Sequence, residues 1–163
     1  MELMVTVSIA TIIMATAVPS MQIMNANSRM SSVANGLAAD LKKARNMAVV
    51  ARRNHTFVAI NSSVSTNIWG NQGWRVTEVV AGVTKDVFSN RTVPQGVVVN
   101  STLNSIVFSA ATGMVQNTIG DTISVTFRVC DANSSKETGF DVLINNFGRV
   151  LVQKHTSSTV CNT

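Results

Sequence analysis

Several residue types are scarce in this 163-residue chain, and each scarcity argues against a class of protein. Tyr is absent, aromatic residues make up 5% and charged residues 13%, about half of the ~25% charged share of a typical soluble domain. With two Cys and two His, the sequence lacks both a C-x-x-C redox motif and ligands at zinc spacing. It also lacks G-x-S-x-G, H-E-x-x-H and a phosphate-binding glycine loop. We therefore expect neither an enzyme nor a bound metal or cofactor.

The charge balance and the cysteines leave two questions open. The formal net charge is +5 and the sequence pI is near 9.9, which permits contact with nucleic acid or an anionic membrane surface but requires neither. Cys130 and Cys161 lie far apart in the last third of the chain. In a reducing compartment such a pair would more often be free thiols, and in an oxidising one a disulfide.

The N-terminal segment is apolar and uncharged from Leu3 to Ser28, and its most apolar part is Leu3–Met24. A helix of about 20 residues, rising ~1.5 Å per residue, crosses the hydrocarbon core of a bilayer. A cleaved signal peptide would begin with basic residues, whereas the early charge here is the acidic Glu2. The segment therefore predicts a retained membrane helix.

Two residues of this segment suit a membrane span poorly. A carboxylate beside hydrocarbon is costly, so Glu2 either has a functional partner or lies among headgroups, where the helix dipole favours an anion. Pro19 lies inside the helical stretch and removes a backbone donor, so we expect a kink or local melting there.

After Ser28 the apolar residues continue at helical spacing. They are Met30, Val33, Leu37, Leu41, Ala44 and Ala48. Polar and charged residues occupy the other face, and no turn dipeptide interrupts the run before Arg53–Asn54. We predict one helix, with a membrane half over residues 1–27 and an amphipathic half over 28–53.

The remainder, residues 54–163, has the signals of strands and short turns. The predicted strands are His55–Ile60, Trp74–Val80, Asp86–Ser89, Val97–Ser101, Ser105–Phe108, Thr122–Cys130, Phe140–Ile144 and Arg149–Lys154. Their short, regular spacing favours antiparallel pairing. The predicted fold class is α+β, with the amphipathic helix on an antiparallel sheet or small sandwich in one globular domain, residues 28–163.

The N-terminus resembles the type IV pilin superfamily. The run from Glu2 to Ala10 is similar to the continuation from that family's glutamate, and Pro19 falls where its helix-kinking proline would. The family's leader, with the glycine and phenylalanine before this glutamate, is missing. We therefore expect that the given start is an internal methionine or that part of the chain is left out.

Later residues are similar to the GspH/FimT/FimU-type minor pilins, and they narrow the resemblance. These residues are Ala44–Ala48, Arg52–Asn54, Trp69, Gly73-Trp74, Ile106–Phe108, Gly113, Cys130-Asp131, Asn145, Gly148–Val150 and Cys161. With the N-terminal signature they cover almost the whole chain. The resemblance implies a pilin-like fold and a minor pilin that primes assembly of a type IV pilus; the alternative is a minor pseudopilin of type II secretion.

The resemblance also implies a location and partners. The subunit would wait in the bacterial inner membrane as a single-pass protein with a periplasmic domain, and then enter an extracellular filament. Its partners would be other major and minor pilins, the inner-membrane assembly platform and, if the full leader exists, the prepilin peptidase. Glu2 would pair with the N-terminal amine of a neighbouring subunit, and Pro19 would mark a segment that can unwind.

A periplasmic domain favours a disulfide between Cys130 and Cys161. It would close a loop of roughly 30 residues, worth ~3 kcal/mol or more in the chain-entropy picture. We further expect one of Trp69 and Trp74 to pack on the core, and the two histidines, His55 and His155, to be solvated.

DNA binding is the remaining alternative. Some relatives that take up DNA carry a glycine-arginine motif with a further arginine, and Gly148-Arg149 here keeps only the first arginine. A set of cations that could contact phosphates or a partner protein is Lys42, Lys43, Arg45, Arg52, Arg53, Arg149 and Lys154. Phosphate contacts need only flexible cations, so these residues could bind duplex DNA weakly, but the missing second arginine argues against this alternative.

Overall fold

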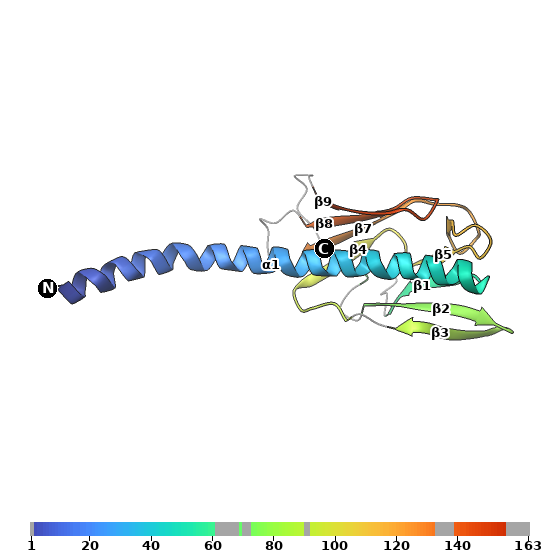
Figure 1. Ribbon diagram of the computed structural model, residues 1–163, viewed down its shortest axis with the longest axis horizontal. Helices are drawn as coiled ribbons and strands as arrows, with labels where there is room; N and C mark the ends of the chain where they lie inside the picture. Colours follow the sequence, from blue (N-terminus) through green and yellow to red (C-terminus); the bar gives the residue numbers. More distant parts are fainter. Residues whose placement is uncertain (1, 61–68, 70–72, 90–91, 133–138, 156–163) are drawn as a thin grey trace.

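The structure is a computed structural model, and it describes residues 2–60, 69, 73–89, 92–132 and 139–155. The side chains of residues 2, 14–20 and 89 lie outside this description. The molecule consists of one long helix and nine strands in two sheets within these ranges. Figure 1 shows the helix extending well beyond the globular part, which covers only its second half.

Helix α1 spans Glu2–Ala51 as one continuous element, which confirms the predicted single helix. It continues through position 19 and curves gently along its first half (Figure 1). It ends where Arg52 takes a positive φ of 52° and Arg53 N–H donates to Ala48 O at 3.2 Å, a left-handed C-terminal cap. Among the described residues, no helix has both the length and the hydropathy needed to cross a membrane. The predicted membrane half therefore stays a prediction.

The first sheet contains five antiparallel strands in the order β3-β2-β1-β5-β6. Their bounds are β1 His55–Ala59, β2 Trp74–Val80, β3 Val83–Ser89, β5 Ser105–Phe108 and β6 Val115–Gln116. Strand β1 pairs with β2 on one side and with β5 on the other, so that Phe57 lies opposite both Val76 and Ile106. The alternation of buried and half-buried residues in β1 follows from one face packing on the core.

The second sheet contains four antiparallel strands in the order β4-β7-β8-β9. Their bounds are β4 Val97–Ser101, β7 Val125–Asp131, β8 Phe140–Ile144 and β9 Val150–Lys154. The second half of α1 contacts strands of both sheets. In Figure 1 the strands β7, β8 and β9 lie on one side of the helix and β1, β2 and β3 on the other.

The core lies between the helix and the two sheets. The predicted helical stripe, from Met30 to Ala48, is buried throughout. Both tryptophans are buried rather than one: Trp69 stacks on Phe57 at 5.5 Å and meets Phe127 edge-on at 4.9 Å. Their indole N–H groups are satisfied, because Trp69 donates to Leu103 O at 2.7 Å and Trp74 to Asp40 Oδ2 at 2.9 Å. Each indole therefore contributes apolar burial without leaving a buried donor unpaired.

Candidate functional site

The first half of α1 presents an uncovered apolar surface. All described side chains from Leu3 to Ile13 are exposed, and Leu3 and Met4 are 81% and 80% exposed. The hydroxyls on this segment bond to carbonyls of the preceding turn: Thr6 donates to Leu3 O at 2.9 Å and Ser8 to Met4 O at 2.7 Å. Such bonds satisfy the polar groups within the helix. The segment can therefore enter an apolar environment without carrying unpaired hydroxyls into it.

The two residues singled out on this helix are placed by their backbone only. Glu2 is the first residue of α1 and Pro19 lies within it, and the side chains of both fall outside the described residues. Their predicted roles, pairing with a neighbouring subunit and local unwinding, therefore stay predictions.

Three of the seven predicted basic contact residues are engaged within the chain. Lys43 Nζ lies 4.2 Å from the centre of the Phe88 ring. Arg45 is half-buried and its Nε donates to Gly113 O at 3.0 Å. Arg53 lies 3.7 Å from Glu78. The first two contacts tie α1 to β3 and to the turn at Gly113, and the third ties the segment after α1 to β2.

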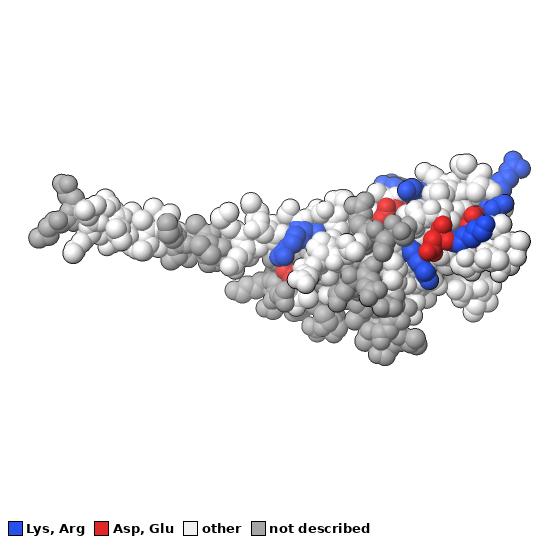
Figure 2. Space-filling model, turned by 90° about the horizontal axis from the view of Figure 1, so that it is seen from below, with Lys and Arg blue, Asp and Glu red and all other residues white. Residues whose placement is uncertain are grey.

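The other four basic residues are Lys42, Arg52, Arg149 and Lys154, and all of them are exposed. Arg149 precedes β9 and Lys154 ends it, so about 17 Å of strand separates them at ~3.4 Å per residue. On the face shown in Figure 2, Lys and Arg atoms lie in several separate places, interspersed with Asp and Glu atoms. On this face the cations do not form one continuous patch.

Only one of the two cysteines, Cys130, lies among the described residues. Cys130 is buried in β7, and the described part of the chain contains no free cysteine. Cys161 lies outside the described residues, so its disulfide with Cys130 remains a prediction.

A partly buried polar cluster of Arg128, Asp141 and His155 in the second sheet was missed by the sequence reasoning. Asp141 on β8 lies opposite Arg128 on β7; its Oδ1 accepts from Arg128 Nε at 3.1 Å, and its Oδ2 lies 2.7 Å from Nδ1 of His155. The prediction of solvated histidines was wrong, because His155 is 4% and His55 1% exposed. The sequence places Arg128 and Asp141 in two predicted strands, which was the available signal. It does not give the strand register that brings the two residues opposite each other.

The described residues contain no group of His, Cys, Asp and Glu that could hold a metal ion. What the structure offers is an uncovered apolar helix, rooted in a globular domain of two antiparallel sheets. This combination is the architecture of a pilin-like subunit.

The comparisons agree with this class. The family model of "Type II transport protein GspH" matches residues 33–148. The structure is similar to the type IV minor pilin FimU of Pseudomonas aeruginosa in two crystal forms. For one crystal form the TM-score is 0.62 and the sequence identity is 19%, and the alignment covers 81% of this chain and 99% of FimU. For the other the TM-score is 0.65 and the identity is 18%, and the alignment covers 83% of this chain and 96% of FimU.

A further solved structure extends the likeness to secretion systems. The minor pseudopilin EpsH from the type 2 secretion system of Vibrio cholerae matches with TM-score 0.57 and 12% identity, over 79% of this chain and 99% of EpsH. No curated protein matches the sequence significantly.

Because the family model matches most of the chain, the chain belongs to the GspH family of the type IV pilin superfamily. Its function is that of a minor pilin or pseudopilin, and the pilin-like α+β fold is confirmed. The family is one of structural subunits that assemble with other pilins in a filament, rather than of enzymes. It is also one of membrane-anchored proteins that reach the periplasm or a filament.

Proposed function

We propose that this chain is a minor pilin that primes assembly of a type IV pilus. The observation that carries the proposal is the exposed apolar surface of the first half of α1. This segment has no charged residue from Leu3 to Ser28, and its hydroxyls, such as those of Thr6 and Ser8, donate hydrogen bonds to carbonyls of the same helix. Before assembly this segment lies in the inner membrane, with the globular domain in the periplasm. After assembly it packs among the same helices of major and minor pilins in the filament core. The assembly platform lifts it there, and the prepilin peptidase acts first on any precursor with a leader.

Glu2 sets the register of this helix in the proposed filament core. A carboxylate in a low-dielectric bundle is strongly disfavoured unless it has a partner, so only one axial position, beside a neighbour's N-terminal amine, accepts it. Pro19 marks a segment whose backbone hydrogen bonds open at low cost, which lets the helix lengthen as it leaves the membrane.

Replacing Glu2 tests the proposal. Glu2→Ala is expected to leave membrane insertion intact and to lower incorporation into filaments about tenfold or more, because the register-setting charge pair is lost. Incorporation is measured by immunoblotting of sheared filaments against the membrane fraction. Asn25→Ala, an exposed polar position on the same helix, is the control. Unchanged incorporation of Glu2→Ala would favour an anchored periplasmic domain that never enters a filament.

The alternative is a minor pseudopilin of type II secretion, a subunit of the same architecture that works in secretion instead of in a pilus, and the comparisons are equally consistent with it. Deleting the chain separates the two: loss of pili with normal secretion supports the pilus subunit, and loss of secretion with normal pili supports the pseudopilin.

Contact with duplex DNA is a second proposed activity, supported by four exposed cations: Lys42, Arg52, Arg149 and Lys154. Because they lie apart, we expect weak binding at low salt that weakens further as salt rises. The log–log slope should be no steeper than about −3.6, from ~0.9 per phosphate contact. Fluorescence anisotropy of labelled duplex with the full chain in detergent measures it. Absence of binding at low salt removes this activity.

A further inference from the structure

Arg29 is the first charged residue after Glu2 along α1. Because a helix rises ~1.5 Å per residue, about 40 Å of helix separates the two residues. A bilayer is about 40–45 Å thick when both headgroup layers are included. With the N-terminus at the inner face of the membrane, Arg29 therefore lies at the level of the outer headgroups. In Figure 1 this part of α1 lies where the free helix meets the globular part.

The guanidinium group of Arg29 has no partner in the described part of the chain. Its side chain is exposed and forms no hydrogen bond or ion pair with any residue that the structure describes. By contrast, Arg45, Arg75 and Arg128 each contact an oxygen atom of their own chain. Basic residues are usually kept on the cytoplasmic side of a membrane helix. An unpaired arginine at the opposite surface is therefore suited to an anionic partner there.

Further hydrogen-bond donors lie beside Arg29. A hollow of about 470 Å³ on α1 is lined by residues that include Gln22, Ser28 and Arg29, all of them exposed. Gln22 and Arg29 lie about two helical turns apart and so share a face of the helix. A guanidinium can donate to two phosphate oxygens in parallel, and an amide and a hydroxyl can donate to the others. None of the described residues that line this hollow is acidic, so the donors together suit a phosphate group.

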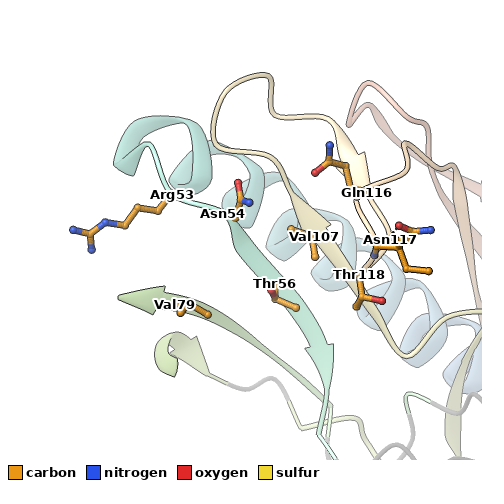
Figure 3. A pocket seen from close by; sticks show the side chains of 10 residues that line it. Arg53, Asn54, Thr56, Val79, Val107, Gln116, Asn117 and Thr118 are labelled. Atoms are coloured by element: carbon orange, nitrogen blue, oxygen red, sulfur yellow. Dashed lines mark hydrogen bonds between the residues drawn. The ribbon is translucent and has the colours of Figure 1, made fainter. Parts of the chain in front are cut away.

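Two other hollows among the described residues are less suited to an anion. One, of about 510 Å³, has Arg53 in its lining, but Nη1 of this arginine lies 3.7 Å from Oε2 of Glu78. Figure 3 shows Arg53 directed away from Thr56 and Val107, which lie on neighbouring strands. The other, of about 360 Å³, has Glu78 in its lining and neither Lys nor Arg among its described residues. Of these three hollows, the one at Arg29 is the one with an unpaired cation.

We propose that Gln22, Ser28 and Arg29 bind the phosphate of a phospholipid in the outer leaflet of the inner membrane, with a preference for an anionic headgroup such as that of phosphatidylglycerol. This inference rests on the proposed function, which places α1 in that membrane before assembly. A zwitterionic headgroup carries its own ammonium group, which competes with Arg29 for the phosphate. Met21, which is 60% exposed, offers the acyl chains an apolar surface that a free phosphate ion would not use. The bound lipid fixes the depth of α1 in the membrane and is released when the subunit enters the filament.

Native mass spectrometry of the full chain, titrated in detergent micelles with phosphatidylglycerol or with phosphatidylethanolamine, tests the inference. The expected result is about fivefold tighter binding of phosphatidylglycerol, in line with the effect of one basic residue near an anionic surface. Arg29→Gln should remove this difference, because glutamine keeps the helix but carries no charge. Arg29→Lys should retain only part of the difference, because an ammonium group lacks the planar fork that matches a phosphate.

Two controls separate this site from a general effect of charge and from a site for free phosphate. Lys85→Gln removes one exposed positive charge from β3, which begins at the far end of the domain from Arg29 (Figure 1), and should leave the lipid preference unchanged. Inorganic phosphate in excess over the lipid should not displace bound phosphatidylglycerol, because the acyl chains contribute to binding.

Several results would overturn the inference. They are equal binding of the two lipids by the unaltered chain, equal effects of Arg29→Gln and Lys85→Gln, full retention of the preference by Arg29→Lys, and displacement of the lipid by inorganic phosphate. Each would leave the proposed function standing, because the Glu2→Ala experiment measures incorporation into filaments and not lipid binding. Recovery of the full chain outside the membrane fraction would overturn both.

Discussion

Gly148→Ala is expected to lower the free energy of unfolding by about 3 kcal/mol, although it adds a single methyl group. Gly148 has a φ of +78° in the turn between β8 and β9, where a residue with a Cβ costs ~1–2 kcal/mol. A Cβ built there would also lie 2.6 Å from Arg45 Cδ and 2.8 Å from Gly113 O. Overpacking of this kind adds ~1–3 kcal/mol. Arg45 has little room to move away, because its Nε donates to Gly113 O.

Gly82 provides a matched control for the backbone term. Its φ of +79° is almost the same, but nothing lies within 4 Å of the Cβ position. Gly82→Ala should therefore cost only the conformational term, about 1 kcal/mol. Urea unfolding of the full chain in detergent, followed by fluorescence of the two buried tryptophans, measures both variants. Equal losses for the two variants would show that the contact of the β8–β9 turn with Arg45 does not restrict position 148.

The tertiary contact of Arg45 could not be predicted from the sequence. Its position on the polar face of an amphipathic helix predicted a solvent-facing cation, and the helix itself was predicted well because local periodicity determines it. Its partner, Gly113, lies 68 positions along the chain, and the contact depends on how the turns of two separate sheets meet the helix. Sequence periodicity carries no information on such contacts.

For the strands too, features set by local sequence were predicted, and features set by long-range pairing were not. Strands β2, β4, β5 and β8 have their predicted bounds, because apolar alternation and flanking turn residues mark them. The prediction missed β6, whose two residues form no pattern, and began β3 at Asp86 instead of Val83. The extra residues of β3 are held by pairing across the hairpin, such as Lys85 opposite Glu78. The division of the strands into two sheets was also beyond the sequence pattern.

Asp141→Ala is expected to destabilise the domain by about 3 kcal/mol, because it removes the acceptor shared by Arg128 and His155. His155 is affected more, since its side chain is only 3% exposed while that of Arg128 is 38% exposed and stays accessible to water. Among the described residues His155 Nε2 has no hydrogen-bond partner, and the ring contacts Asp141 through Nδ1. A buried donor that loses its acceptor typically costs about 1–3 kcal/mol, and more where the acceptor is an ionised carboxylate.

The contrast with an exposed pair makes this prediction specific. Asp86 lies 3.8 Å from Arg75, and both side chains are about half exposed, so Asp86→Ala should cost at most about 0.5 kcal/mol. For a chain of this length, 3 kcal/mol corresponds to a fall in Tm of about 6–12 °C. Calorimetry of the full chain in detergent measures both variants. Hydrogen exchange should also quicken at the His155 amide, which donates to Gly139 O at 3.1 Å, because the end of β9 loses its side-chain tether. If the two aspartate variants have the same Tm, the cluster does not hold β9 against β8. Pairing of the strand backbones alone would then account for the position of β9.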